Sequence, residues 1–154
     1  MHRYLTLVLF IVLVLGAGTL IGFMTLPGAW YGGLAKPPFN PPNWIFAPVW
    51  TLLYIMVAVA GWRTWQREPR GAAMTVWFIQ LALNFIWSPV FFGAHMIGAA
   101  LVIVALLLVA NLAFIGIRWQ RDRSAALLFT PYAAWVAFAT LLNGSLWILN
   151  PTGV

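Results

Sequence analysis

Cysteine is absent from this chain of 154 residues, and only 6% of its side chains are charged. Without cysteine there is no disulfide, no thiolate nucleophile and no cysteine-based metal or iron–sulfur site. Soluble domains carry about 25% charged residues. A chain of this length that is 64% hydrophobic cannot bury so much apolar surface in a core surrounded by water. The composition therefore predicts an integral membrane protein whose solvent is the lipid bilayer.

Carboxylates are nearly absent as well, and Glu68 and Asp122 are the only two. Both lie among arginines, so we expect them to be solvated partners of those arginines and not acids or bases of an active site. His2 and His95 are far apart in the sequence and have no metal-ligand partners, which predicts no metal site. The sequence also lacks a phosphate-binding loop, a dinucleotide fingerprint and a nucleophile elbow. The lack of a carboxylate within an apolar stretch disfavours an ion-coupled pump.

What the chain does contain is five apolar stretches, each about the 20 residues that a helix needs to cross a bilayer. The predicted fold is an all-α integral membrane protein, a bundle of five transmembrane helices in a single domain over residues 1–154. The first stretch is too long for the apolar part of a typical signal peptide, so we expect a retained helix. The predicted helices cover residues 4–26, 44–65, 72–92, 96–117 and 125–149.

Proline and glycine mark the interruptions of this pattern. The connection 27–43 contains Pro37, Pro38, Pro41 and Pro42, which disfavour helix, so we expect a stiff, extended, aromatic lid. Pro131 lies inside the fifth stretch and predicts a kink there. In the first stretch Gly18 and Gly22 form a GxxxG pair, which favours close contact between helices in lipid.

Positive charge is confined to the ends of the stretches, and the formal net charge is +6. Five crossings place only Lys36 on one side of the membrane, and the positive-inside rule makes the other side cytoplasmic. We therefore expect a cytoplasmic N-terminus, an outer C-terminus and an outer lid, in the cell membrane of a bacterium. Cations at helix ends do not form the stripe that a nucleic-acid partner needs. The opposite side holds Arg3, Arg63, Arg67, Arg70, Arg118, Arg121 and Arg123.

Tryptophan is abundant, with ten residues, and it normally collects at the membrane–water interfaces. Three of these residues, Trp50, Trp87 and Trp135, lie deeper, because a rise of about 1.5 Å per residue puts them in the middle or outer half of the membrane. Broad indole faces at that depth suit a flat, conjugated, apolar ligand. The interfacial set consists of Trp44, Trp62, Trp65, Trp119 and Trp147.

Helical spacing aligns the deep tryptophans with polar and aromatic residues on three faces. An amide that faces lipid is costly, so these faces should turn inward and enclose a cavity beneath the lid. Gln80 and Asn84 could instead simply tie helices together. Ala139 matters through its small size, which leaves space between deep rings. The three faces are Trp50 and Tyr54; Gln80, Asn84, Trp87 and Phe91; and Tyr132, Trp135, Ala139 and Asn143.

Four segments carry a more specific pattern. They read Trp30-Tyr31-x-x-Leu34-x-Lys36-Pro37; Pro41-Pro42-x-Trp44-x-Phe46-x-x-Val49-Trp50-x-x-Leu53-Tyr54; Leu83-Asn84-x-x-Trp87-Ser88-Pro89-x-Phe91-Phe92-Gly93; and Pro131-Tyr132-x-x-Trp135-x-x-Phe138-Ala139-Thr140-x-Leu142-Asn143. In order and spacing these segments resemble the translocator protein/tryptophan-rich sensory protein family, over essentially the whole chain.

The resemblance implies a five-helix bundle in membrane lipid, usually a homodimer, with no required cofactor. It implies a pocket under the first loop for porphyrins such as protoporphyrin IX or haem, and for isoquinoline or benzodiazepine-type ligands. Some bacterial members degrade protoporphyrin under light and oxygen through pocket tryptophans, and Trp50 and Trp135 match these candidate catalytic positions. No Lys or Arg follows Tyr132, which disfavours sterol binding there. The implied pocket residues are Trp30, Tyr31, Trp50, Tyr54, Asn84, Trp87, Phe91, Trp135, Ala139 and Asn143.

We therefore expect a membrane receptor or sensor for porphyrin-type ligands. Asn84, with Tyr31 or Asn143, would supply orienting hydrogen bonds, and Lys36 would pair with a propionate. One alternative is an enzyme for light- and oxygen-dependent porphyrin degradation, which needs no acid–base residues. A second alternative is a transporter of tetrapyrroles or sterols, which the lack of an internal repeat disfavours.

Overall fold

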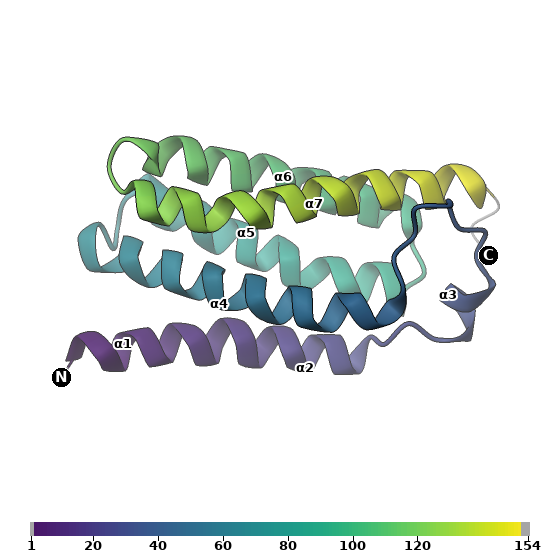
Figure 1. Cartoon of the computed structure of the whole chain (residues 1–154), viewed down its shortest axis with the longest axis horizontal. Helices are drawn as coiled ribbons and strands as arrows, with labels where there is room; N and C mark the ends of the chain where they lie inside the picture. The colour runs from purple at the N-terminus through teal and green to yellow at the C-terminus, as the bar shows by residue number, and fades with distance from the viewer. Residues whose placement is uncertain (1, 152–154) are drawn as a thin grey trace.

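The computed structural model of the chain describes residues 2–151 and contains no strand among them. Five helical spans lie side by side in a bundle (Figure 1). The prediction of an all-α membrane protein with five transmembrane helices is therefore confirmed. The observed span ends differ from the predicted ones by at most two residues. The spans are Tyr4–Met24, Asn43–Arg67, Ala72–Gly93, Ile97–Trp119 and Arg123–Leu149.

Two of the spans contain a π-helical turn, a wider turn that is frequent at functional sites. The first span consists of α1 (His2–Ile11), the π turn η1 (Val12–Gly16) and α2 (Ala17–Met24). The third consists of α5 (Ala72–Ser88) and the π turn η2 (Pro89–Gly93). The others are the single helices α4 (Asn43–Arg67), α6 (Ile97–Trp119) and α7 (Arg123–Leu149). Helix α7 is continuous through Pro131, and the kink predicted there stays a prediction.

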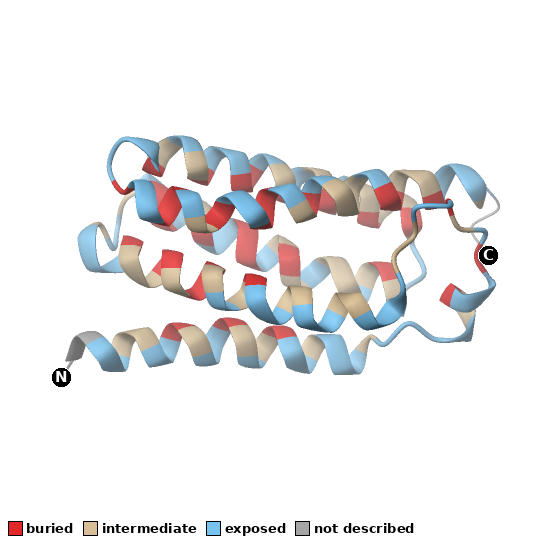
Figure 2. Cartoon of the chain, in the orientation of Figure 1, coloured by how far each residue is buried: buried red, intermediate tan, exposed pale blue. Residues whose placement is uncertain are grey.

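Helix α7 organises the bundle, because it packs against both α6 and α4. Helix α5 packs mainly on α6, and the first span lies at the edge against α4 (Figure 1). Buried residues follow the inward faces of the spans, whereas exposed residues follow the outward faces (Figure 2). Many exposed residues are large and apolar, such as Leu52, Val109 and Leu141. This pattern is expected where lipid tails, which are as apolar as leucine, form the solvent.

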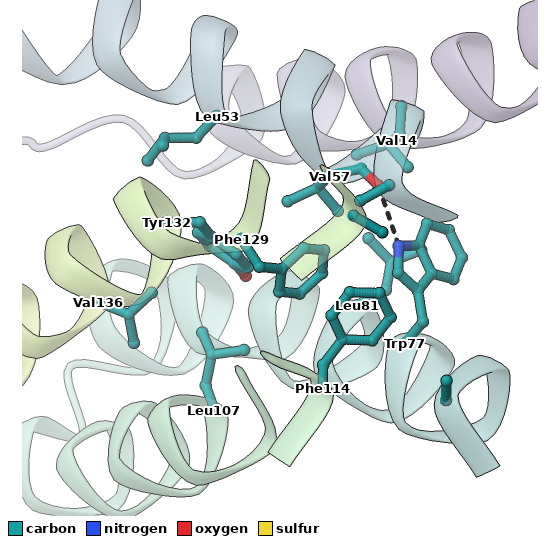
Figure 3. Packing of buried hydrophobic residues seen from close by; sticks show 14 of the residues in the cluster. Val14, Leu53, Val57, Trp77, Leu81, Leu107, Phe114, Phe129, Tyr132 and Val136 are labelled. Atoms are coloured by element: carbon teal, nitrogen blue, oxygen red, sulfur yellow. Dashed lines mark hydrogen bonds between the residues drawn. The ribbon is translucent and has the colours of Figure 1, made fainter. Parts of the chain in front are cut away.

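A buried tryptophan that the sequence pattern did not single out holds α5 against α4. The Trp77 side chain is 0% exposed, and its Nε1–H donates to the Val57 carbonyl oxygen at 3.0 Å (Figure 3). A Cβ on Gly61 would lie 2.3 Å from this indole, so only glycine allows the close approach. Gly18 likewise leaves room for the Tyr54 ring, since a Cβ on Gly18 would lie 2.4 Å from that ring. The Gly18 contact predicted from GxxxG is thus made within the chain, whereas a Cβ on Gly22 would meet nothing within 4 Å.

The connection between the first two spans differs in part from the prediction. We expected an extended path over residues 27–43, but the short helix α3 (Ala29–Gly33) forms within it. Pro27 precedes α3, and the four prolines from Pro37 onward follow it, so no proline interrupts the residues of α3. The remainder of the segment, residues 34–42, contains no helix before α4 begins at Asn43. We call residues 27–42 the lid.

The two ends of the bundle carry different connections (Figure 1). The lid, the α5–α6 connection and the end of α7 lie at one end, which we call the lid end. The start of α1, the α4–α5 connection and the α6–α7 connection lie at the other end. We call this second end the arginine end, defined by Arg63, Arg67, Arg70, Arg118, Arg121 and Arg123.

Candidate functional site

The deep aromatic residues surround a small cavity at the lid end of the bundle. Its volume is about 30 Å³, and its lining is almost entirely apolar. The lid, α4, α5 with η2, and α7 all contribute side chains. The lining consists of Tyr31, Phe46, Trp50, Trp87, Phe91, Phe92, Trp135, Phe138, Ala139, Leu142, Asn143 and Leu146.

The structure brings together seven of the ten residues that the sequence implied for a pocket. Three of the ten do not line the cavity. Trp30 lies behind the lining, with its ring stacked on His95 at 4.1 Å and edge-on to Phe91 at 5.8 Å. Tyr54 and Asn84 lie in a polar layer that is described below. The seven that line the cavity are Tyr31, Trp50, Trp87, Phe91, Trp135, Ala139 and Asn143.

The polar layer is a chain of hydrogen bonds across α4, α5 and α7. The Tyr54 hydroxyl donates to Asn84 Oδ1 at 3.2 Å, and Asn84 Nδ2 donates to the Tyr132 hydroxyl at 2.9 Å. The Tyr132 hydroxyl in turn donates to Gln80 Oε1 at 3.0 Å. Asn84, Gln80 and Tyr132 are all buried. In this closed arrangement the amides of Asn84 and Gln80 tie helices together, the alternative raised for them from sequence.

The remaining polar groups expected to orient a ligand are also engaged within the protein. Asn143 Oδ1 accepts from Trp87 Nε1 at 3.2 Å, and Asn143 Nδ2 donates to the Ile97 carbonyl oxygen at 2.9 Å. The Tyr31 hydroxyl donates to Asn40 Oδ1 at 3.0 Å. The cavity therefore offers a ligand aromatic faces and shape, with few free hydrogen-bonding groups.

The rings of the lining contact one another at angles typical of aromatic clusters. Trp87 stacks on Phe91 with centroids 5.3 Å apart, and Trp135 meets Phe46 edge to face at 6.0 Å. Trp50 links the cavity to the polar layer, because its ring lies 5.4 Å from Tyr54 and 6.3 Å from Tyr132. Movement of the Trp50 ring would therefore disturb both tyrosines.

Sequence reasoning missed five residues of the lining. The signal for four of them was helical spacing, since Phe46 lies four positions before Trp50 and the other three recur every four positions along α7. The fifth, Phe92, reaches the lining through the π turn η2. There the adjacent rings of Phe91 and Phe92 both contact the Tyr31 ring, with centroids 6.2 and 5.4 Å away. The missed residues are Phe46, Phe92, Phe138, Leu142 and Leu146.

Among the described residues, the Asn150 side chain makes the hydrogen bonds that join the lid to the end of α7. Asn150 Oδ1 accepts from the Ala35 backbone N–H, and Asn150 Nδ2 donates to the Ala35 carbonyl oxygen, both at 3.0 Å. Asn150 Nδ2 also donates to the Leu146 carbonyl oxygen at 2.8 Å, which fixes the amide on the end of α7. A residue outside the cavity thus closes the lid by a pair of backbone hydrogen bonds.

Lys36 and Tyr31 stabilise the lid from within. Lys36 Nζ donates to the carbonyl oxygens of Gly32 and Leu34 and lies 4.8 Å from the centre of the Tyr31 ring. The lysine predicted to pair with a propionate is therefore a partner of the lid itself in this closed arrangement. Burial raises the pKa of Tyr31 above its ordinary value, although its hydrogen bond to Asn40 acts in the opposite direction.

The arginine end is built from ion pairs. Asp122 lies 2.9 Å from Arg63 and 3.1 Å from Arg67, and Glu68 lies 3.1 Å from both Arg118 and Arg121. We expected both carboxylates to be solvated, but the Asp122 side chain is only 2% exposed, whereas that of Glu68 is 34% exposed. Asp122 is buried because it also caps α7, where its Oδ1 accepts from the Ala125 N–H.

The pKa of Asp122 is lowered despite its burial. Burial by itself raises the pKa of a carboxyl group, because it disfavours the charged form. The hydrogen bonds from Arg63 and from the Ala125 backbone, together with the charges of Arg63 and Arg67, outweigh this effect. Asp122 is therefore an ionised structural partner of Arg63 and Arg67.

The part of the chain that the structure describes contains no cluster of three or more metal-ligating side chains. The cavity lining includes neither a carboxylate nor a histidine. These features define a class of protein: an integral membrane bundle of five helices with an aromatic cavity closed by a lid. Residues 10–148 match the TspO/MBR family, and the chain belongs to this family.

Similar proteins occur in distant organisms. The chain is 38% identical over 135 residues to the tryptophan-rich sensory protein of Cereibacter sphaeroides, covering 88% of this chain and 85% of that protein. It is 39% identical, over an alignment of 159 positions, to the tryptophan-rich protein TspO of Chlorobaculum tepidum, covering 97% of this chain and 98% of that protein. It is 39% identical over 123 residues to the human translocator protein, covering 77% and 73%.

Proposed function

We propose that the protein is a membrane receptor or sensor that binds porphyrins and related tetrapyrroles, and isoquinoline or benzodiazepine-type ligands, in the aromatic cavity. The observation that carries the proposal is the convergence of Trp50, Trp87 and Trp135 from three helices on one apolar cavity under the lid. Indole faces stack on flat conjugated rings. The names of relatives, a sensory protein and a translocator protein, support the receptor part of the proposal.

Binding of such a ligand requires the lid to move. The cavity of about 30 Å³ is roughly a tenth of the smallest pockets that hold drug-sized ligands, which span about 300–1,000 Å³. Opening the Asn150–Ala35 clamp frees the lid, and rotation of the Trp50 and Trp135 rings then widens the cavity. The structure therefore represents the closed state of the proposed receptor, and ligand association should be limited by lid opening.

We further propose that the lid end faces the outside of a bacterial cell and the arginine end faces the cytoplasm. The support is the confinement of arginines to one end, which follows the positive-inside rule. Cysteines introduced singly at Ser124 and at Ser145, which lie near opposite ends of α7, test this orientation in intact cells. Labelling of S145C alone by a membrane-impermeant maleimide supports it, and labelling of S124C alone contradicts it.

Titration of the purified protein with protoporphyrin IX, followed by quenching of tryptophan fluorescence, tests the binding site. We expect Trp50→Ala combined with Trp135→Ala to weaken binding at least tenfold, since stacking on aromatic side chains contributes about 0.5–1.5 kcal/mol per pair beyond burial. The matched control is Trp44→Ala, because Trp44 lies on the same helix but is 73% exposed. Unchanged affinity in the double variant, or equal loss in the control, would rule out this cavity.

The position of Trp50 and Trp135 in the lining also favours a second candidate function, light- and oxygen-dependent breakdown of a bound porphyrin. Absorption spectra of the complex, recorded during illumination in air and under argon, separate this activity from passive binding. A new product that forms only in air and disappears in Trp135→Phe supports the enzyme. Simple bleaching that is the same in the variant contradicts it.

A further inference from the structure

Helix α6 carries a single polar side chain between its ends. From residue 97 to residue 117 every other residue is apolar or glycine, and the exception is Asn111. Asn111 is 0% exposed, and it lies on the same helix face as Leu107 and Phe114, which point toward α7 (Figure 3). An amide buried at this depth costs free energy unless hydrogen bonds replace those that it makes in water. The aromatic cavity does not explain this amide, because α6 contributes no side chain to the lining.

Asn111 lies level with two residues of the polar layer. Helix α5 begins eight residues before Gln80, and α6 ends eight residues after Asn111, so both amides lie about 12 Å from the arginine end. Tyr132 lies nine residues after the start of α7, at about the same depth. Helix α6 packs against both α5 and α7, and the Asn111 side chain lies close to the Tyr132 hydroxyl. This hydroxyl also donates to Gln80 Oε1 at 3.0 Å, so the three side chains meet in the interior of the bundle.

Three polar atoms at this meeting point make no hydrogen bond within the part of the chain that the structure describes. They are Gln80 Nε2, Asn111 Nδ2 and Asn111 Oδ1. Both residues are 0% exposed, so bulk water does not reach these atoms. A buried amide that stays unpaired is strongly destabilising, and such atoms in native proteins usually contact an ordered bound molecule. Their occurrence on two facing helices therefore points to a molecule bound between α5 and α6.

The unpaired atoms define the chemistry of the bound molecule. Two amide nitrogens donate and one amide oxygen accepts, so the molecule must both accept and donate hydrogen bonds. A metal cation would find only Asn111 Oδ1, since Gln80 Oε1 already accepts from Tyr132. An anion would find no positive side chain in the polar layer, whose members are tyrosines and amides. Water meets these requirements, because buried waters make about three hydrogen bonds to otherwise unpaired polar groups.

We propose that Gln80 and Asn111 form an internal water site that bridges α5 to α6 in the centre of the bundle. The water accepts from Gln80 Nε2 and Asn111 Nδ2, and it donates to an oxygen beside them, either Asn111 Oδ1 or the Tyr132 hydroxyl. The bridge extends the polar layer of α4, α5 and α7 to α6, so that these four spans share one hydrogen-bond network. The site is separate from the aromatic cavity and does not depend on porphyrin binding.

Solid-state NMR of the full-length protein in phosphatidylcholine bilayers tests the site, with water itself as the probe. Isotope labels are placed in the side-chain nitrogens of asparagine, glutamine and tryptophan, and magnetisation transfer from water protons to each nitrogen is measured. We expect several-fold more transfer to Gln80 Nε2 and Asn111 Nδ2 than to Trp77 Nε1. This indole is the matched control, because it is equally buried but donates to the Val57 carbonyl oxygen. Transfer to the two amides that is no greater than transfer to the indole overturns the proposal.

Two variants of nearly the same shape test whether the water bridges the two helices. Asn111→Val removes the polar partner on α6, so transfer to Gln80 Nε2 should fall several-fold. Asn111→Thr keeps a hydroxyl in place of one methyl group and should retain most of the transfer. Unchanged transfer in Asn111→Val, or an equal loss in both variants, overturns the bridge. Direct transfer between the Gln80 and Asn111 amides of the wild-type protein, with none from water, would show that the amides bond each other and would also overturn it.

Discussion

The two ends of the bundle are closed by different chemistry. At the lid end, neutral hydrogen bonds and aromatic contacts fasten the lid, with Asn150 on Ala35, Tyr31 on Asn40 and Trp30 on His95. At the arginine end, the carboxylates of Asp122 and Glu68 form ion pairs with four arginines. Each neutral contact contributes about 0.5–1.5 kcal/mol, so the lid can open one contact at a time. We therefore expect the bundle to open at the lid end while the arginine end remains assembled.

The arginine end is also the more interlocked of the two. Asp122, in the α6–α7 connection, reaches Arg63 and Arg67 at the end of α4. Glu68, in the α4–α5 connection, pairs with Arg118 in the last turn of α6 and with Arg121 in the α6–α7 connection. The α6–α7 connection is therefore paired with α4, and the α4–α5 connection is paired with α6. The lid is joined to α7 differently, by the two hydrogen bonds of Asn150 and by the edge-to-face contact of Phe39 with Phe138 at 6.3 Å.

The largest expected effect follows from removal of the buried carboxylate. Asp122→Ala leaves Arg63 and Arg67 without their partner and removes the cap of α7, so we expect the free energy of unfolding to fall by about 3 kcal/mol. Thermal unfolding in a single detergent measures the change. Arg121→Ala is the comparison variant, and it should cost at most about 1 kcal/mol, because the Arg121 side chain is 66% exposed and its ion pair with Glu68 is screened by solvent. Equal losses would show that the burial of Asp122 adds nothing to the stability that its ion pairs provide.

The lid clamp should give the next largest effect, at the other end of the molecule. Asn150→Ala removes two hydrogen bonds to Ala35, which should favour lid opening by about 2 kcal/mol, or roughly 30-fold. Hydrogen exchange of the amides in residues 29–36 measures the opening. Ser145→Ala is the control, since Ser145 bonds only the Leu141 carbonyl of its own helix. Exchange that stays slow in Asn150→Ala would show that aromatic packing alone holds the lid.

A smaller change tests the lid from within. Tyr31→Phe keeps the ring against Phe91 and Phe92 but removes the hydrogen bond to Asn40, so the lid should open more easily by about 1 kcal/mol. Because the ring stays, porphyrin affinity should change little at equilibrium, while association should become faster. Stopped-flow fluorescence with protoporphyrin IX separates the two quantities. Slower association in this variant would argue against lid opening as the limiting step.

The smallest effects should come from pH, and they should have opposite directions at the two ends. The lowered pKa of Asp122 means that its stabilisation is complete above the ordinary value of about 3.9 and is lost as pH falls through the folded pKa. The raised pKa of Tyr31 means that its stabilisation is complete below about pH 10 and is lost as pH rises through the folded pKa.

Hydrogen exchange resolved by region measures this contrast. Acid should first loosen the start of α7, and alkali should first loosen the lid. Asp122→Asn should abolish the acid response of α7, and Tyr31→Phe should abolish the alkaline response of the lid. If both ends loosened together at low pH or at high pH, titration of Asp122 and Tyr31 would not explain the pH dependence of hydrogen exchange.

Some features of the fold and of the site were accessible to sequence reasoning because they depend on local periodicity. Apolar length predicts the spans, and helical spacing places Trp50, Trp87 and Trp135 on inward faces. The short helix α3 was missed because its residues precede the prolines that dominated the interpretation of the lid. Trp77 was missed because nothing in its own segment shows that Gly61, sixteen positions earlier, leaves room for it.

The sequence by itself determined the membrane as solvent, the number of spans, the segregation of charge and the aromatic character of the cavity, since each follows from composition or from neighbours along one helix. Only the tertiary structure decided that Asp122 is buried, that Asn84 is bonded to Tyr54 and Tyr132, and that Asn150 fastens the lid. These depend on partners up to 115 positions away, and a helical pattern carries no information on what lies opposite it across the bundle.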